Sequence, residues 1–374
     1  MNELNEKHIA LIPLLGMDLM AEKIKDYIKD ISSDTICEVI PVKLQRFATG
    51  DAKAVLQKSV RGKDVFVLVD VGNYDDRYRY SMFDYENHLS PDDHFQNLVR
   101  TISAIGGKAS RISVIMPLLY SARQDRRTSR ESLDCAVALQ HLEKIGIENI
   151  MSFDVHDARV QNAIPFMGFD NLVPTYQTIK ALCRYYSDLF FDEQHMVMVS
   201  PDFGGMNRNF MYADVLGLDI GLFYKRRDVN EIEDGKNPIL IHKYIGPDLV
   251  GKDVLIVDDI IASGESISDS VIHVKKMGAK RVFVGATFGF FTRGTKKFDE
   301  MYEEGLLESA FITNASYLKK EVIQAPWYKE VNTIKYISFY IYSVSTGISI
   351  SNILDPNLKI VELIKKYRNM YPVK

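Results

Sequence analysis

The fold of this chain is decided by the stretch Val254-Leu255-Ile256-Val257-Asp258-Asp259-Ile260-Ile261-Ala262-Ser263-Gly264-Glu265-Ser266-Ile267. Its first four residues are apolar and rich in β-branched side chains, which is typical of a strand buried on both faces. Two aspartates follow where we expect the strand to leave the sheet. We expect residues 262–265 to form a short loop, and Ser266 to be the N-cap of a helix that runs to about residue 277.

A strand, a small-residue loop and a helix N-terminus present backbone N–H groups at one place, and this arrangement binds anions. Phosphate is the anion that we expect. The carboxylates of Asp258 and Asp259 would repel phosphate by themselves, but they suit ribose hydroxyls or a hydrated Mg²⁺ beside a loop that holds a 5-phosphate. The alternative is a buried strand followed by two exposed loop acids.

The totals describe a soluble protein of ordinary composition. A length of 374 residues predicts about two domains, and a net charge of −4 argues against a nucleic-acid-binding role. Cys37, Cys135 and Cys183 have no metal-binding spacing and are expected to be reduced thiols of a cytoplasmic protein. Residues 1–7 lack a signal-peptide apolar run, and no apolar run approaches the roughly 18 residues of a membrane span, so we expect neither secretion nor membrane insertion.

Apolar strands alternate with amphipathic helices along the chain, which predicts doubly wound α/β domains. We expect one domain over residues 1–172 and a second over 173–374. The expected strands are 9–15, 38–44, 65–69, 111–116 and 150–153 in the first, and 196–200, 220–224, 254–257 and 281–287 in the second. The expected helices are 17–31, 94–105, 133–145, 176–187, 207–216, 266–277, 297–304 and 358–367.

Two segments of the first half interrupt this alternation. Residues 72–93 mix tyrosines with acids, and we expect an excursion folded onto the surface or a subunit contact, with partner binding as the alternative. Residues 120–131 place four arginines in eight residues directly after a predicted strand. Arginine pairs with phosphate oxygens and stacks on flat rings, so this loop suits a nucleotide polyphosphate. The alternative is a solvated, salt-bridged loop.

Further candidates follow other predicted strands. His156 stands two residues after Asp154 at a strand end, where it is either a metal ligand or a hydrogen-bonded structural histidine. Asp202 precedes the paired glycines of Pro201-Asp202-Phe203-Gly204-Gly205, which let a backbone approach a ligand closely. The strand at 220–224 leads into Lys225-Arg226-Arg227, and the polar residues 228–237 predict a mobile loop.

Six of these segments, in this order, resemble motifs of the ribose-phosphate pyrophosphokinase (PRPP synthetase) family. They are Phe47–Asp51, Ser59–Val65, Tyr120–Arg126, Asp154–His156, Val199–Gly205 and Lys225–Arg227. The opening stretch is similar to the ribose 5-phosphate loop of type I phosphoribosyltransferases. The resemblance implies two tandem type I phosphoribosyltransferase-like domains, each a mainly parallel sheet flanked by helices.

The resemblance also implies an activity, namely transfer of the diphosphoryl group of ATP to O1 of ribose 5-phosphate, which yields PRPP and AMP. It implies a Mg²⁺ cofactor, a homo-oligomer, and catalytic roles for Lys225 and Arg227. The implied ATP ligands are Phe47, Thr49, Asp51, Arg123, Gln124 and Asp125, and the implied Mg²⁺ ligands are His156 and Asp202. The implied ribose 5-phosphate ligands are Asp258, Asp259, Ala262, Ser263, Gly264, Glu265 and Ser266.

Four residues depart from the family pattern. Ala262 and Ser263 stand where an acid followed by threonine is usual, Glu265 where glycine is usual, and Phe288 where histidine is usual. A lost carboxylate and an added one near a phosphate would weaken substrate binding. Two other functions therefore stay open: a non-catalytic regulatory subunit, and a phosphoribosyltransferase that consumes PRPP. The latter has no use for the Phe47–Asp51 turn or the arginine loop.

Overall fold

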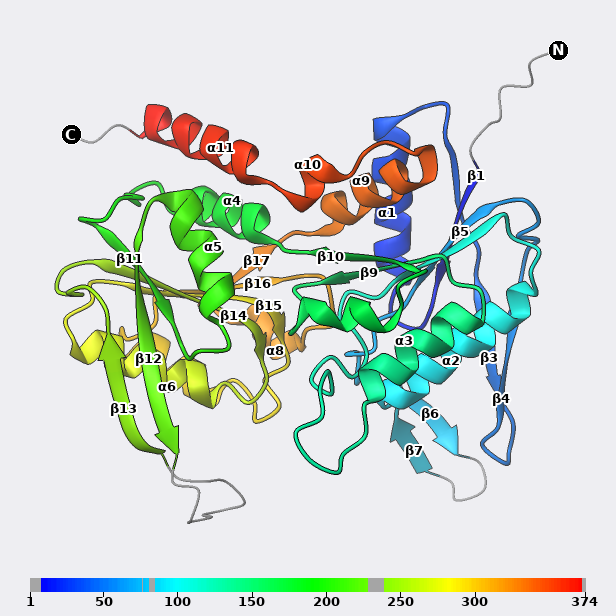
Figure 1. The fold of residues 1–374 in the computed structure, drawn as a ribbon, viewed down its shortest axis with the longest axis horizontal. Coiled ribbons are helices and arrows are strands. Elements are labelled where there is room, and N and C mark those ends of the chain that lie inside the picture. The colour runs from blue at the N-terminus through cyan, green and yellow to red at the C-terminus, as the bar shows by residue number, and fades with distance from the viewer. Residues whose placement is uncertain (1–7, 76, 81–84, 228–238, 372–374) are drawn as a thin grey trace. The chain divides into compact units, whose positions relative to one another are not determined.

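The computed structural model describes residues 8–75, 77–80, 85–227 and 239–371 (Figure 1). The chain forms two compact units. The first unit ends at Val173 and also includes Asn314–Tyr317 and Asn332–Asp355; the second holds Pro174–Thr313, Leu318–Val331 and the residues from Pro356 onward. The expected boundary after residue 172 lies next to the first change of unit. The expected division puts Asn314–Tyr317 and Asn332–Asp355 in the second domain, whereas the structure places these two returning segments in the first unit.

The first unit contains a six-stranded sheet whose neighbouring strands are all parallel, in the order β10-β9-β8-β5-β1-β2. Its strands are β1 (His8–Pro13), β2 (Ile36–Val39), β5 (Asp64–Leu68), β8 (Arg111–Ile115), β9 (Asn149–Phe153) and β10 (Gly168–Leu172). Helices α1 (Asp18–Ile31) and α9 (Ile334–Thr346) contact each other and lie on one face, and α2 (Pro91–Ile105) and α3 (Asp134–Lys144) lie on the other (Figure 1). A 3₁₀ helix (Ala158–Ala163) and α10 (Ser351–Leu354) complete it. The predicted doubly wound fold is confirmed.

The strand expected over residues 38–44 is wrong, because the chain forms two strands there. β2 ends at Val39, and β3 (Val42–Arg46) pairs with β4 (Ala52–Leu56) in an antiparallel hairpin. Pro41 stands between β2 and β3 and has no backbone N–H, so it cannot donate to the ladder. The apolar pattern runs through Pro41 and conceals the break.

The excursion at 72–93 contains a second antiparallel hairpin, formed by β6 (Arg77–Tyr80) and β7 (Tyr85–His88). Helix α2 then begins at Pro91, earlier than the expected residue 94. The reason is a capping box: Ser90 Oγ accepts from the Asp93 N–H, and the Asp93 carboxylate accepts from the Ser90 N–H.

Buried polar contacts attach the two returning segments to the first unit. The Asp70 carboxylate, two residues after the end of β5, accepts from Ser316 Oγ at 2.8 Å and from the Tyr317 N–H at 2.7 Å. Its burial raises the pKa of Asp70, and these hydrogen bonds oppose that rise. On α9, Tyr340 Oη donates to Asp170 at 2.7 Å, and Arg111 donates to the Val344 carbonyl at 3.0 Å. Contacts between residues this far apart in the sequence leave no local pattern.

The second unit contains a seven-stranded sheet in the order β13-β12-β11-β14-β15-β16-β17. Only the pair β12–β13 is antiparallel. The strands are β11 (Met196–Ser200), β12 (Asp219–Arg227), β13 (Ile239–Ile245), β14 (Asp253–Ile261), β15 (Val282–Gly289), β16 (Ser309–Thr313) and β17 (Tyr328–Val331). The helices are α4 (Thr175–Tyr185), α5 (Met206–Leu216), α6 (Glu265–Lys276), α7 (Lys296–Glu303), α8 (Lys320–Gln324) and α11 (Asn357–Met370).

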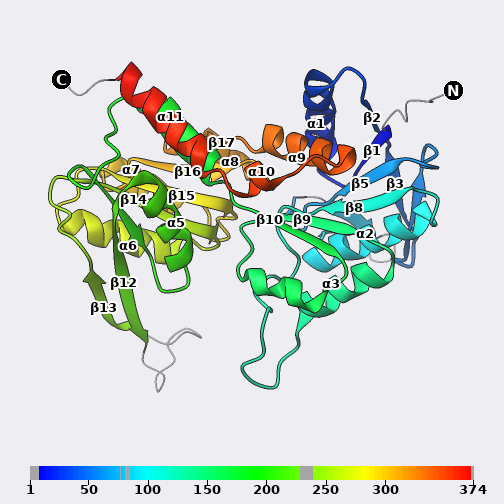
Figure 2. The same ribbon diagram turned by 45° about the horizontal axis from the view of Figure 1, so that its top comes forward.

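Strand β14 is covered on both faces, as its apolar start predicts. Val254 and Ile256 pack in a core with residues of α6 and α7, and Leu255 and Val257 pack in a second core with residues of α4, α5 and α11. Figure 2 shows α11 on one side of this sheet and α6 on the other. All four side chains are buried. In the part of the chain that the structure describes, no helix is both long and apolar enough to cross a bilayer.

Candidate active site

The aspartate pair lies inside β14, so the expectation that the strand ends before it is wrong. Beyond Val257, β14 stays paired with β15 through Asp258, Ile260 and Ile261. On its other side, the last residue pair with β11 is Val199 with Ile256. At the aspartates, β14 is therefore no longer paired with β11, but it is still paired with β15.

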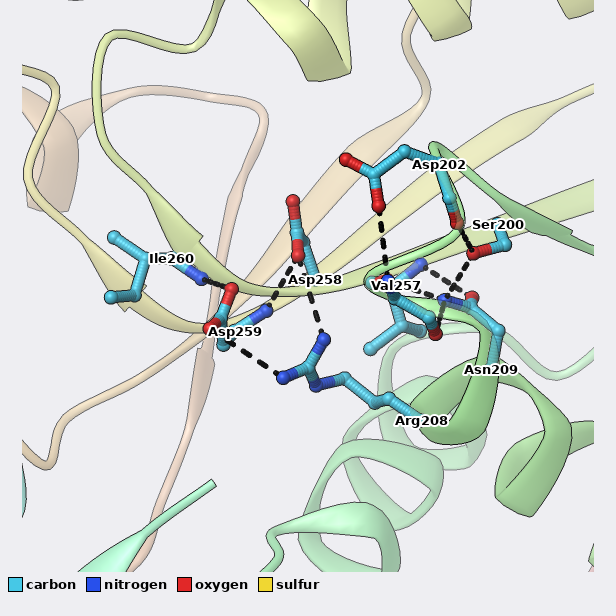
Figure 3. Close-up of polar contacts among 9 residues, drawn as sticks. Ser200, Asp202, Arg208, Asn209, Val257, Asp258, Asp259 and Ile260 are labelled. Atoms are coloured by element: carbon cyan, nitrogen blue, oxygen red, sulfur yellow. Dashed lines mark hydrogen bonds and ion pairs between the residues drawn. The ribbon is translucent and has the colours of Figure 1, made fainter. Parts of the chain in front are cut away.

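Arg208, from the first turn of α5, lies between the two carboxylates (Figure 3). Its Nη1 is 3.5 Å from Asp258 Oδ1, and its Nη2 is 3.6 Å from Asp259 Oδ2. Burial raises the pKa of Asp258 above its ordinary value, the negative charge of Asp259 raises it further, and the Arg208 guanidinium lowers it. One cation thus faces two adjacent acids, and carboxylate oxygens in this arrangement can accept hydrogen bonds from the hydroxyl groups of a ligand.

The loop after β14 is held by a second loop of the same unit. The Ile261 carbonyl accepts from the Phe290 N–H at 2.8 Å, and the Ala262 carbonyl accepts from the Thr292 N–H at 2.9 Å. Helix α6 then begins at Glu265 with Gly264 as its N-cap, so the assignment of Ser266 as the N-cap is wrong. Backbone N–H groups in the first turn of an α-helix have no partner within the helix, which keeps the expected anion-binding geometry two residues earlier.

Gly264 is required by both conformation and space. Its φ is +81°, in the left-handed region, and a Cβ at this position would lie 2.8 Å from Phe298 Cε2. We expect Gly264→Ala to lower the free energy of unfolding by about 2 kcal/mol or more, because backbone strain and overpacking add. Thermal or denaturant unfolding measures this loss.

Gly294→Ala is the matched control for that prediction. Gly294 has a φ of +80°, and a Cβ there would meet nothing within 4 Å. It therefore reports the left-handed strain alone. Equal losses in the two variants would contradict the role of the contact with Phe298.

The structure shows the surroundings of three residues that depart from the family pattern. Glu265 forms an ion pair with Arg293, which offsets the added carboxylate. Phe288 is buried in β15 and stacks on Phe290 at 6.4 Å between ring centroids, so it is a core residue in this unit. Ala262 is half-buried and supplies no carboxylate.

Asp202 lies in the loop between β11 and α5. Its Oδ1 accepts from the Gly205 N–H at 3.0 Å, and its carbonyl accepts from Ser200 Oγ at 2.7 Å. The residue is exposed, and a carboxylate oxygen is the ligand type that Mg²⁺ prefers. Among the described residues, no group of three or more His, Cys, Asp and Glu side chains forms a metal site. A single exposed carboxylate suits Mg²⁺, which keeps several waters and is usually bound through one or two carboxylates and substrate phosphates.

The residues assigned to catalysis lie on β12, which extends past the expected end at residue 224. Lys225 pairs with His242 and Arg227 pairs with Ile239 of β13, with a register shift between Arg226 and Arg227. The side chains of Lys225 and Arg227 are not described. The mobile loop predicted at 228–237 lies outside the described residues.

In the first unit, the turn predicted to bind adenine is the tip of the β3–β4 hairpin. The Phe47 N–H donates to the Asp51 carbonyl at 2.8 Å, and Thr49 Oγ1 donates to the Asp51 carboxylate at 2.9 Å. The Phe47 ring is 46% exposed, and Lys53 Nζ lies 5.4 Å from its centroid. An exposed ring on a closed turn can stack on a planar ligand without rearrangement.

The arginine loop follows β8 in the same unit. Arg123 and Gln124 are exposed and Asp125 is half-buried, and the Gln124 N–H donates to the Ser121 carbonyl at 2.9 Å. His156 is also exposed and lies just beyond the end of β9. Because His156 belongs to the first unit and Asp202 to the second, the structure describes each proposed metal ligand within its own unit only.

The second unit thus brings together Asp202, Asp258 and Asp259, since the charge of Asp202 also raises the pKa of Asp258. It adds Arg208, which the sequence reasoning missed. The sequence does contain a signal for Arg208. It is an arginine in the first turn of the helix that follows the Asp202 loop, and this position lies at the same edge of the sheet as the acids.

Comparison with known proteins gives consistent results. Residues 17–146 match the family model for the N-terminal domain of ribose phosphate pyrophosphokinase, and residues 170–315 match that of the phosphoribosyl transferase domain. The chain is 26% identical over 362 residues to a ribose-phosphate pyrophosphokinase of Ureaplasma parvum, covering 96% of this chain and 98% of that protein. It is 27% identical over 326 residues to one of Mycoplasma pneumoniae, covering 86% and 89%.

A solved structure shows the same fold. It is the phosphoribosylpyrophosphate synthetase of Mycobacterium smegmatis, with a TM-score of 0.70 and 21% identity, covering 91% of this chain and all of that one. Two family models in the expected order, and relatives that match along most of their length, support one conclusion. The chain belongs to the ribose-phosphate pyrophosphokinase family.

Proposed function

We propose that the protein is a ribose-phosphate diphosphokinase, which transfers the diphosphoryl group of ATP to O1 of ribose 5-phosphate and yields PRPP and AMP. The observation that carries this proposal is the acidic pair on β14, paired with Arg208 and followed by the anchored loop and the N-terminus of α6. It combines acceptors for sugar hydroxyls with donors for a phosphate, which is the chemistry of a sugar phosphate.

In this proposal the ribose is bound by β14 and the loop after it. Asp258 and Asp259 accept hydrogen bonds from the ribose hydroxyls, and the cation of Arg208 favours the ionised form of Asp258. The 5-phosphate is bound by residues 262–266, by backbone N–H groups and by the hydroxyls of Ser263 and Ser266. The pair Glu265–Arg293 keeps the extra carboxylate from acting as an isolated charge beside the phosphate.

The nucleotide in this proposal is ATP, bound by residues of the first unit. Phe47 stacks on the adenine, supported by the polar side chains of Thr49 and Asp51. Arg123, with Gln124 and Asp125, contacts the nucleotide and its phosphates. We also propose that the protein assembles as a homo-oligomer, as the resemblance implies.

The chemical step needs positioning and charge stabilisation rather than a covalent intermediate. O1 of the ribose bonds to the β-phosphorus as the bond from that phosphorus to the α,β-bridging oxygen breaks. The hydroxyl proton passes to solvent, and AMP leaves with the bridging oxygen. Lys225 and Arg227 stabilise charge on the transferring and leaving oxygens. Asp202 in the second unit and His156 in the first would each be a ligand for Mg²⁺, which would supply charge neutralisation for the phosphates.

We expect His156→Ala to raise the Mg²⁺ concentration that gives half-maximal activity by about tenfold or more, since even outer partners of metal ligands change affinity by that factor. A Mg²⁺ titration of the initial rate measures it. His141→Ala is the control, because His141 is an exposed histidine of the same unit on α3. An unchanged Mg²⁺ titration in His156→Ala would remove His156 from the metal site.

The proposed location is the cytoplasm. Burial raises the pKa of Cys37, Cys135 and Cys183 to about 12, so these thiols are poor nucleophiles for disulfide exchange. All three are free cysteines, which fits a reducing compartment.

The test is an incubation of the purified protein with ATP, ribose 5-phosphate and Mg²⁺, with AMP and PRPP both quantified. We expect the two products in equal amounts. A folded protein that binds ATP but forms neither product would favour a regulatory subunit, and Ala262→Asp would then test whether the missing carboxylate is the cause. A protein that does not bind ATP and consumes PRPP would be a phosphoribosyltransferase.

A further inference from the structure

Asn209 is fully buried on α5, and its side chain bonds to the backbone of β14 (Figure 3). Asn209 Oδ1 accepts from the Val257 N–H at 3.1 Å, and Asn209 Nδ2 donates to the Val257 carbonyl at 2.8 Å. Both backbone groups of one strand residue are thus paired with a single side-chain amide. An amide carries one acceptor and one donor side, as a peptide group does, so it is the side chain that can make this pair of bonds.

The Asn209 amide makes hydrogen bonds to β14 just beyond the point where pairing with β11 ends. The ladder between β11 and β14 ends at the pair Val199 and Ile256, and β11 itself ends at Ser200. Pro201 follows and has no backbone N–H with which to extend the ladder. Without Asn209, the Val257 N–H and carbonyl would have no bond from this side of the strand, at a position that is 3% exposed.

The surroundings are built for this amide. The Nδ2 group also donates to the Gly205 carbonyl at 2.9 Å, which uses its second hydrogen. A Cβ on Gly205 would lie 3.4 Å from Asn209 Nδ2 and 3.2 Å from Ser200 Oγ. The tighter of these two contacts is the one with Ser200, and the contact with the amide is an ordinary van der Waals distance. The oxygen and both hydrogens of the Asn209 amide have partners.

We propose that Asn209 is a positioning residue for ribose 5-phosphate binding, acting through the backbone of Val257 to fix Asp258. This inference rests on the proposed function of the Asp258 site. Val257 immediately precedes Asp258, so a shift of its peptide moves the carboxylate directly. Arg208, the preceding residue on α5, contacts the carboxylates of Asp258 and Asp259. One helical turn therefore holds both the backbone and the charges of the acidic pair.

The position predicts a selective effect on one substrate. A displacement of about 1 Å at a site costs up to about a hundredfold in rate when it misaligns a bound group. We expect Asn209→Leu, which keeps similar bulk and removes every hydrogen bond, to raise the KM for ribose 5-phosphate by about tenfold or more. The KM for ATP should stay within about twofold, because the proposed ATP ligands lie in the other unit.

The experiment compares the parent with Asn209→Leu, Asn209→Gln and Ala213→Gly in the full chain. Ala213 is buried on α5 one turn later, so Ala213→Gly weakens the helix and keeps both hydrogen bonds between Asn209 and Val257. Asn209→Gln keeps the amide, and we expect it to recover part of the affinity for ribose 5-phosphate; it also serves as the test variant if Asn209→Leu does not fold. Hydrogen exchange of residues 253–261 is measured in every variant.

A selective rise in the KM for ribose 5-phosphate, absent from Ala213→Gly at comparable thermal stability, supports the positioning role. Equal changes in both KM values, or a loss of stability with unchanged KM values, overturns it. If the parent makes no PRPP, the proposed function fails, and hydrogen exchange then decides the inference. Faster exchange confined to residues 253–261 in Asn209→Leu supports it, and faster exchange spread across the second unit overturns it.

Discussion

Lys225→Ala should lower the turnover of PRPP formation by about a hundredfold to a thousandfold, the loss seen when one preorganised donor to transition-state charge is removed. The reason lies in the chemistry of the step. Negative charge shifts among phosphate oxygens as the diphosphoryl group leaves AMP, and a cation placed there stabilises the transition state more than the bound substrates. The KM values should change less than turnover.

The position of Lys225 makes this variant easy to interpret. It lies on β12 and pairs through its backbone with His242, and alanine keeps those backbone bonds. Lys243→Ala is the matched control, because Lys243 is an exposed lysine of the neighbouring strand, paired with Tyr224. Steady-state kinetics of both variants, with circular dichroism as a check of the fold, complete the experiment. Near-normal turnover in Lys225→Ala would refute the catalytic role.

Asp258→Asn should abolish most of the activity and at the same time stabilise the protein without substrates. Burial and the charge of Asp259 raise the pKa of Asp258, so keeping this carboxylate ionised costs free energy in the folded state. Asparagine removes the charge and keeps an oxygen that can accept from the Asp259 N–H, as Asp258 Oδ1 does at 2.9 Å. We expect a gain of about 1 kcal/mol or more near pH 7, which is what a shift of one pKa unit amounts to.

The gain should depend on pH in a defined direction. An acid whose folded pKa is raised supplies its full stability below its unfolded pKa and loses it as the pH rises through the folded value. The advantage of Asp258→Asn should therefore vanish near pH 3 and grow toward neutral pH. Thermal unfolding from pH 3 to pH 8 measures this trend. A constant difference across that range would contradict the burial of an ionisable carboxylate.

Asp253→Asn gives the opposite sign in the same strand. Asp253 is buried and accepts from Arg281 Nε at 2.9 Å and Nη2 at 2.6 Å, a bidentate pair. Removing its charge leaves Arg281 with one fewer partner, so this variant should be less stable than the parent near pH 7. Opposite signs in the two variants would show that the charge of Asp253 stabilises the fold, whereas the charge of Asp258 does not.

Much of the fold could be predicted from local pattern. The strand expected at 196–200 is β11, and the apolar start of β14 is buried on both faces, because a continuous apolar run has few other solutions. The attachment of Asn332–Asp355 to the first unit could not be predicted in this way. It depends on contacts such as that of Arg111 with Val344, and neither residue has a neighbour that signals it.

The site was predicted in its residues more than in its geometry. The apolar pattern predicts that the strand leaves the sheet at Asp258 and Asp259, but pairing with β15 keeps both residues in β14. The residue type of Ser266 predicts that it is the N-cap, but the helix starts after Gly264, whose φ is in the left-handed region. Arg208 and Asn209 were missed because their roles come from a helix placed against a strand end.

The central claim is that a diphosphoryl group moves intact from ATP to the ribose. Its most direct test uses ATP labelled at the β-phosphorus, with ribose 5-phosphate, Mg²⁺ and the purified protein. We predict that the label enters PRPP in proportion to the AMP formed, and that AMP carries none of it. Label recovered in ADP with a newly phosphorylated sugar, or label that stays in ATP while the folded protein binds both substrates, would contradict the account.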